Sequence, residues 1–152
     1  MTTPSAPAPA PALVNGRIQT RFGEFNLVRP EIVTFPEGIP GFEQCRRFVV
    51  ILADELSPLT CLQALDEPYP SFLASAPATL RADYRPELPD ADRLKLRVHS
   101  GDPVLWLVIV TIGRGDVSAN LKAPIAINAR TMLGRQVVLE EDLPVAWQIE
   151  SR

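Results

Sequence analysis

The sequence predicts a mainly all-β fold, either a small antiparallel barrel-like domain or a compact sandwich, with one or two short helical turns. Three observations support this. Sixteen prolines in 152 residues leave little room for long helices. The segments between the prolines are short, and several alternate apolar and polar residues as half-buried strands do. Residues 104–112 are apolar and β-branched apart from one Thr, which is typical of a central strand.

Each predicted strand lies between turn residues. In residues 17–22 apolar and polar residues alternate, and Gly23-Glu24 is expected to close a two-residue hairpin because Gly adopts positive φ. The proline-rich residues 77–92 are expected to hold the helical turns. The other predicted strands are short: 32–35, 48–53, 59–65, 72–76, 93–99, 104–112, 125–128 and 136–139.

The composition indicates one globular domain preceded by a tail. Residues 1–13 consist almost entirely of Ala, Pro, Thr and Ser, so we expect a disordered tail, and residues 14–152 form the single predicted domain. Hydrophobic residues make up 46% of the chain and charged residues 22%, which is ordinary for a soluble domain. The tail lacks the basic start and apolar run of a signal peptide, and residues 104–112 are too few to cross a bilayer as a helix. We therefore expect a soluble, cytoplasmic protein without membrane contact.

The residues offer little for catalysis or for metal binding. Cys45 and Cys61 lie in or beside apolar stretches, and we expect both to be reduced core thiols. His99 is the single histidine, and two isolated cysteines with one histidine do not have the spacing of metal ligands. We predict no enzymatic activity, no small-molecule substrate, no cofactor and no metal. A cysteine-dependent hydrolase remains a remote alternative that needs Cys61 and His99 to meet in the fold.

The predicted strand 93–99 raises a second alternative, a small nucleic-acid-binding barrel. Leu94, Leu96 and Val98 would point to one side, and the other side would carry Arg93, Lys95, Arg97 and His99. Aromatic residues do not alternate with these charges, so bases would find no stacking platform. The net charge of −3 also provides no general attraction for phosphates. We favour an exposed strand protected by its charges, and we expect no direct nucleic-acid contact.

Two segments are more constrained than the rest. Residues 32–43 contain two prolines and two glycines, which fix a tight bend expected to present Ile39 and Phe42 to a partner. The alternative is that glycines and prolines only build the turn while Phe35 fills the core. Residues 118–128 contain Asn120 and Asn128, whose side chains are expected to tie down the backbone at the ends of a short strand.

These segments resemble the FliW family of flagellar assembly factors. The resemblance is carried by F-P-E-G-I-P-G-F-E at 35–43 and by A-N-L-x-A-P-I-x-I-N at 119–128, and it covers roughly residues 17–140. The chain departs from the family pattern in its Pro/Ala tail, at Ala64, where a Ser is more usual, and after Leu139.

The resemblance implies a small antiparallel β-barrel-like fold and a regulator that exchanges partners without catalysis. Such proteins bind flagellin in the cytoplasm; when flagellin is exported, they bind the RNA-binding translational repressor CsrA and relieve repression of flagellin synthesis. The expected partner-binding residues come from the two motifs: Phe35, Glu37, Gly38, Ile39, Pro40, Gly41, Phe42, Asn120, Leu121, Ala123, Pro124 and Asn128.

Overall fold

The computed structural model describes residues 16–27 and 30–149. The predicted tail, residues 1–13, and the first residues of the predicted domain lie outside this part. Within the described part, no helix has the length and apolar character that crossing a bilayer requires.

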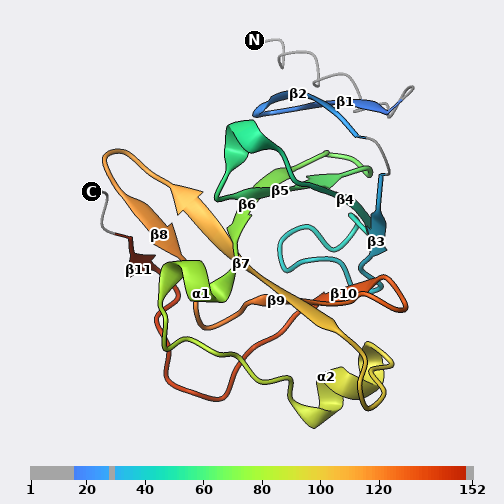
Figure 1. The fold of residues 1–152 in the computed structure, drawn as a ribbon, viewed down its shortest axis with the longest axis vertical. Coiled ribbons are helices and arrows are strands. Elements are labelled where there is room, and N and C mark those ends of the chain that lie inside the picture. Colours follow the sequence, from blue (N-terminus) through green and yellow to red (C-terminus); the bar gives the residue numbers. More distant parts are fainter. Residues whose placement is uncertain (1–15, 28–29, 150–152) are drawn as a thin grey trace, which may run out of the picture.

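Seven of the described strands close into a barrel, which confirms the predicted fold class (Figure 1). Around the barrel the order is β7, β6, β5, β4, β3, β10 and β9, and β9 pairs again with β7. Every pairing is antiparallel except that of β3 with β10, which is parallel. The strands are β3 (Ile32–Thr34), β4 (Arg47–Ile51), β5 (Thr60–Ala64), β6 (Ser71–Ser75), β7 (Val104–Ile112), β9 (Ile125–Asn128) and β10 (Leu133–Gln136).

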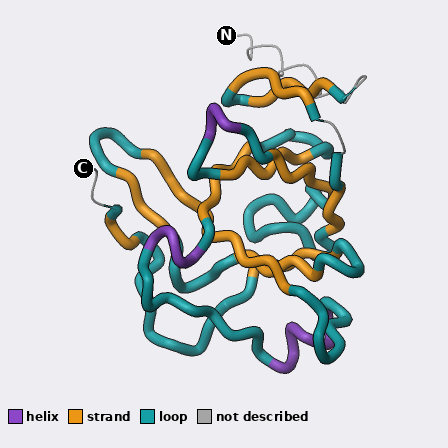
Figure 2. Tube along the Cα trace, viewed as in Figure 1, coloured by secondary structure: helices purple, strands orange, loops and turns teal. Residues whose placement is uncertain are grey.

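Strand β7 is the central strand that its sequence predicted. Its first half pairs with β9, with Leu107 opposite Ile125. Its middle pairs with β6, and its end pairs with β8 (Val117–Ala119), which in turn pairs with β11 (Trp147–Gln148). The end of β7, with β8, projects as an arm beyond the barrel (Figure 2).

A separate hairpin covers one part of the barrel. It consists of β1 (Arg17–Thr20) and β2 (Gly23–Asn26), and Ile18 and Phe25 pack against the cluster formed by β4 and β5. The turn consists of Arg21 and Phe22, because Gly23 already pairs with Thr20. The hairpin was therefore predicted correctly, but its turn was placed two residues too late.

Short helices occupy two of the connections, as predicted for residues 77–92. Helix α1 spans Pro77–Leu80 and helix α2 spans Asp90–Lys95, and a single 3₁₀ turn, η1, spans Asp54–Leu56.

The predicted strand 93–99 is wrong. Its first residues belong to α2, which begins after Pro89, carries Asp90 and Asp92 in its first turn and has basic residues in its last turn. Arg97 then adopts positive φ and ends the segment. Leu94 is 81% exposed whereas Leu96 is 1% exposed, so the two do not share an apolar strand face. The basic strand face proposed for nucleic acid does not exist.

The predicted strand 136–139 is also displaced, because β10 ends at Gln136. The following residues still bond regularly with the preceding loop: Val137 N–H donates to the Pro124 carbonyl, and Leu139 N–H donates to the Lys122 carbonyl. Residues 137–139 are therefore hydrogen-bonded to the loop before β9, but they do not form a regular strand.

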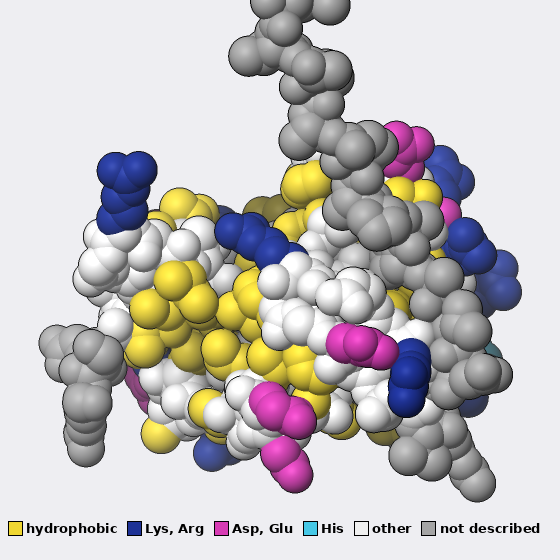
Figure 3. Space-filling model, turned by 90° about the horizontal axis from the view of Figure 1, so that it is seen from above, with side chains coloured by type: hydrophobic (Ala, Val, Ile, Leu, Met, Phe, Trp, Pro, Cys, Tyr) yellow, Lys and Arg dark blue, Asp and Glu magenta, His cyan; other side chains and the backbone are white. Residues whose placement is uncertain are grey.

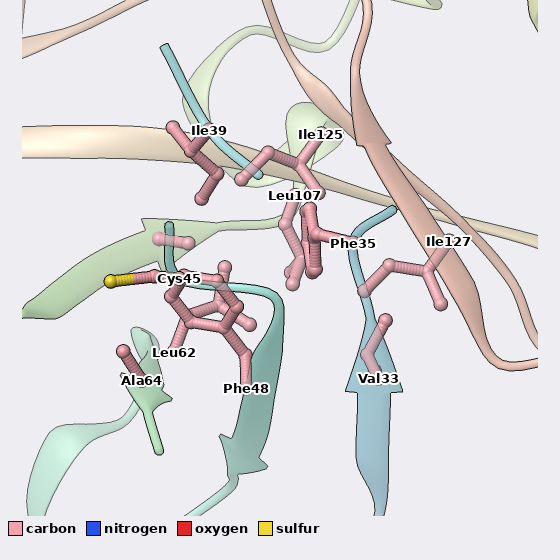
Figure 4. Close-up of a cluster of buried hydrophobic side chains, with 11 residues drawn as sticks. Val33, Phe35, Ile39, Cys45, Phe48, Leu62, Ala64, Leu107, Ile125 and Ile127 are labelled. Atoms are coloured by element: carbon pink, nitrogen blue, oxygen red, sulfur yellow. The ribbon is translucent and has the colours of Figure 1, made fainter. Parts of the chain in front are cut away.

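The barrel interior is filled by side chains from its strands and from the loop between β3 and β4 (Figure 4). Phe35 and Phe48 meet edge to face, with ring centroids 4.9 Å apart. Cys45 belongs to this cluster, and Cys61 belongs to the cluster under the hairpin. Both thiols are free and buried, as predicted.

Candidate functional site

Most of the first motif, residues 35–43, lies in the loop formed by residues 36–46. This loop folds back inside the ring of strands (Figure 1). Three backbone hydrogen bonds fix it: Gly38 N–H donates to the Phe35 carbonyl, Phe42 N–H to Ile39, and Cys45 N–H to Phe42, at 2.9, 2.7 and 3.0 Å. The predicted tight bend is therefore confirmed.

The apolar side chains of this loop have different surroundings. Ile39 is 3% exposed and belongs to the same buried cluster as Leu107 and Ile125 (Figure 4), so the expectation that the bend presents Ile39 at the surface is wrong. Phe35 fills the core, as the structural interpretation held. Phe42 is half-buried and packs edge to face on Phe72, with ring centroids 5.4 Å apart. Of Phe35, Ile39 and Phe42, only Phe42 is therefore partly exposed to solvent.

Ion pairs attach the loop to the neighbouring elements. The exposed Glu37 carboxylate contacts the Arg135 guanidinium and lies 3.3 Å from Lys95 Nζ. Arg135 Nε also donates to Asp92 Oδ1 at 2.6 Å. Arg135, on β10, therefore links the loop to helix α2. The sequence interpretation gave Glu37 a contact role but assigned no role to Arg135.

The other end of the loop is fixed by Asp66. Its Oδ2 accepts hydrogen bonds from the backbone amides of Arg46 and Arg47, each at 2.9 Å, and its Oδ1 lies 3.0 Å from the Arg47 guanidinium. Partial burial raises the pKa of the Asp66 carboxyl, but these hydrogen bonds and the Arg47 charge outweigh it, and the pKa is lowered overall.

The second motif forms the turn between β8 and β9. Asn120 Oδ1 accepts from the Ala123 amide at 3.1 Å, and its backbone N–H donates to the Ile109 carbonyl. Leu121 is fully buried, and its carbonyl accepts a hydrogen bond from the Tyr84 hydroxyl at 2.7 Å. Pro124 is buried as well.

Asn128, at the end of β9, is fully buried, and both polar atoms of its side chain make hydrogen bonds. Its Nδ2 donates to the carbonyls of Leu96 and Arg97, at 2.9 and 3.3 Å, and its Oδ1 accepts from the Arg130 amide at 3.0 Å. The expectation that Asn120 and Asn128 tie down the backbone is therefore confirmed. Whether this motif also contacts a partner stays a prediction.

Gly134 lies where the strand carrying Arg135 crosses the first motif. A Cβ atom at this position would lie 2.7 Å from Cζ of Phe35 and 2.9 Å from a methyl group of Val33. A larger residue would therefore displace the core ring. The sequence analysis assigned no role to this glycine.

An open groove of about 660 Å³ lies where the hairpin turn, the first motif and the ends of β6 and β7 meet. Apolar side chains gather on the face seen in Figure 3, between the hairpin and the β7–β8 arm. The residues that line the groove are Gln19, Thr20, Arg21, Phe22, Phe42, Gln63, Tyr69, Pro70, Ser71, Phe72, Leu73, Ile109, Val110, Thr111 and Ile112. Of these, the sequence analysis had singled out Phe42 alone, because the groove combines four distant segments.

The residues considered for catalysis have different surroundings. Burial raises the pKa of the Cys61 thiol to about 12, so this group stays protonated at neutral pH. His99 is exposed, and its ring lies 3.5 Å from the Arg130 guanidinium. Among residues 16–27 and 30–149, no three His, Cys, Asp or Glu side chains come together as a metal site would need.

Fold and site together define a small β-barrel protein whose interior is filled by its own loop. Comparison with known proteins identifies the family. The family model described as FliW protein matches residues 17–149, and the chain belongs to the FliW family.

The relatives resemble this chain over most of their length. A flagellar assembly factor FliW of Carboxydothermus hydrogenoformans is 38% identical over 130 residues, covering 84% of each chain. Another, of Thermotoga neapolitana, is 36% identical over 124 residues, which are 80% of this chain and 83% of that one. The crystal structure of a flagellar assembly factor FliW superposes with a TM-score of 0.79 at 31% identity, covering 90% of this chain and 98% of the other.

Proposed function

We propose that this chain acts in flagellar assembly as a non-enzymatic protein that binds flagellin in the cytoplasm and, when free, binds and antagonises CsrA. The observation that carries the proposal is family membership over residues 17–149, with both sequence motifs in place. In this function, the level of unexported flagellin determines whether CsrA is bound, and so sets flagellin synthesis.

We assign the motif residues to two roles, according to their burial. Ile39, Leu121 and Asn128 are buried and hold the scaffold. Of the exposed residues of the first motif, Glu37 is held in ion pairs, whereas Pro40 and Gly41, with half-buried Phe42 beside them, are proposed to meet a partner. A half-buried aromatic on a rigid turn is the kind of residue that concentrates binding energy in protein interfaces.

Charge supports an electrostatic contribution to CsrA binding. The chain has a net charge of −3, and opposite charge on an RNA-binding partner would speed association. We therefore expect the association rate with CsrA to fall as salt rises.

The proposal is tested with the purified full chain, flagellin and CsrA from the same bacterium. Isothermal titration should give binding to each partner, and size-exclusion chromatography of all three should show that excess flagellin releases CsrA. A chain that binds neither protein at micromolar concentration would refute the proposal. A ternary complex that excess flagellin does not dissociate would refute the exchange of partners.

A matched pair of variants tests the role of the first motif. Phe42→Ala should weaken binding of at least one partner by about tenfold or more, as loss of an interface anchor does, while Leu52→Ala should leave it unchanged. Leu52 is the control because it is 78% exposed and lies outside the groove and both motifs. If Phe42→Ala unfolds the chain at the assay temperature, Phe42 belongs to the core and the contact surface lies elsewhere.

A further inference from the structure

We propose that the groove beside Phe42 binds an extended, mainly apolar segment of a protein partner by adding it as a strand along β6 and β7. This goes beyond the proposed function, because it specifies the conformation and chemistry of the bound segment, whichever protein supplies it. Two independent features of the groove support this proposal. The ends of β6 and β7 each have one edge without a neighbouring strand, and the groove is lined by aromatic side chains and one charged residue.

The strand edges arise because β6 and β7 separate. Their pairing in the described structure ends at Leu73 opposite Val110, yet β6 begins at Ser71 and β7 continues to Ile112. On their other sides both ends remain paired, Ser71 with β5 and Ile112 with β8. Each end therefore has one edge without a strand neighbour, and both residues line the groove.

The direction of the backbone groups follows from two backbone hydrogen bonds. The Pro70 carbonyl accepts from Ala64 on the β5 side, and the Ile109 carbonyl accepts from Asn120 on the β8 side. In antiparallel strands, the backbone groups of alternate residues point to opposite sides. The N–H and C=O of Ser71 and of Ile112 consequently point towards the groove. These are the groups that an added strand uses.

The lining specifies the side chains of the bound segment. Phe22, Phe42 and Phe72 are half-buried, so each offers part of an aromatic ring. Arg21 is the one charged residue of the lining, which contains no carboxylate. An added strand directs alternate side chains to one face. The groove therefore suits a segment with large apolar residues at alternate positions and an Asp or Glu near Arg21.

The hairpin turn holds this arrangement in place. The Arg21 amide donates to the Ser71 hydroxyl at 3.3 Å, which joins the turn to the start of β6. Arg21 is thereby positioned beside one of the two free strand edges, so the apolar contacts and the charge act on the same segment.

The test uses a displayed library of random twelve-residue peptides, selected on the whole chain and counter-selected on the Ile112→Glu variant. Ile112 is 62% exposed at the groove, so this change places a charge on its edge without disturbing the core. Leu52→Glu is the matched control, because Leu52 is also an exposed aliphatic residue, at 78%, and lies outside the groove. Enriched peptides are synthesised, and their binding is measured by fluorescence anisotropy.

We expect the peptides to alternate large apolar residues and to carry one carboxylate. Ile112→Glu should weaken binding by about tenfold or more, as burial of an unpaired charge does, and Leu52→Glu by less than about twofold. Arg21→Glu should weaken binding too, and a Lys in place of the peptide carboxylate should restore it. N-methylation should abolish binding at alternate peptide positions and be tolerated between them.

Three results would overturn the inference. The first is that selection yields no peptide that distinguishes the chain from Ile112→Glu. The second is that N-methylation is tolerated at every position, which excludes backbone pairing. The third is that the peptides repeat apolar residues every three or four positions and become helical on binding, which shows a helix in the groove.

Discussion

Two glycines in the loop between β3 and β4 permit a matched test of how that loop is closed. Gly38 and Gly41 both have positive φ, at 67° and 91°. A Cβ at Gly41 would meet nothing within 4 Å, whereas a Cβ at Gly38 would lie 2.6 Å from both the Cα and the carbonyl oxygen of Glu43. Those atoms belong to the backbone, so they cannot move aside as a side chain would.

The expected magnitudes follow from these contacts. An L-residue in the left-handed region costs about 1–2 kcal/mol, and both Ala variants incur this cost. Overpacking adds about 1–3 kcal/mol at Gly38 alone. The gain from a stiffer unfolded chain is the same for both and cancels. Gly38→Ala should therefore be less stable than Gly41→Ala by about 1–3 kcal/mol, a difference in Tm of about 2–12 °C for a domain of this size.

Urea unfolding and thermal melting of both variants measure this difference. The unfolding midpoint in urea should fall further for Gly38→Ala with an unchanged slope, since a single methyl group hardly changes the surface exposed on unfolding. The φ of Gly41 lies further from the left-handed minimum, so backbone strain alone predicts the opposite order. Equal midpoints, or a less stable Gly41→Ala, would refute steric closure of the loop against Glu43.

Two further predictions concern buried or paired polar groups. Asn128→Ala removes the 2.9 Å hydrogen bond to the Leu96 carbonyl, which keeps only the longer 3.4 Å bond from the Thr131 hydroxyl, and it removes the acceptor of the Arg130 amide. It should lower the free energy of unfolding by about 1–3 kcal/mol in urea titrations; an unchanged midpoint would contradict this. The lowered pKa of Asp66 stabilises the fold above the unfolded carboxyl pKa of about 3.9, and this contribution is lost as the pH falls through the folded value. Asp66→Asn should therefore be less stable than the native chain at pH 7, with the gap closing below about pH 4; a gap independent of pH would argue against the linkage.

The sequence predicted the strands best where a single local signal dominated. The apolar, β-branched run 104–112 matches β7 at both ends, and 125–128 matches β9. The prediction of a strand at 93–99 was wrong because alternation over so few residues does not distinguish a strand from a helical turn followed by a bend. The acidic start and basic end of α2 favour a helix there, and this signal was available in the sequence.

The site was harder to predict than the strands, because its geometry depends on contacts between distant segments. The prolines and glycines of the first motif correctly indicated a tight bend, but they do not say which side chains turn inward. Ile39 is buried because the loop folds into the barrel, where Leu107 and Ile125 meet it. The groove combines Phe22, Phe42 and Phe72 with the end of β7, and these segments approach one another only in the closed barrel.

Contacts through β10 and α2 connect the two motifs. Phe35 packs where Gly134 allows it, and Arg135 on the same strand contacts Glu37 of the first motif and Asp92 of α2. Asn128, from the second motif, holds the end of α2 through the Leu96 carbonyl. These contacts therefore stabilise one conformation of the loop between β3 and β4. A rigid loop loses little conformational entropy on binding, which would favour the anchor role proposed for Phe42 at the groove.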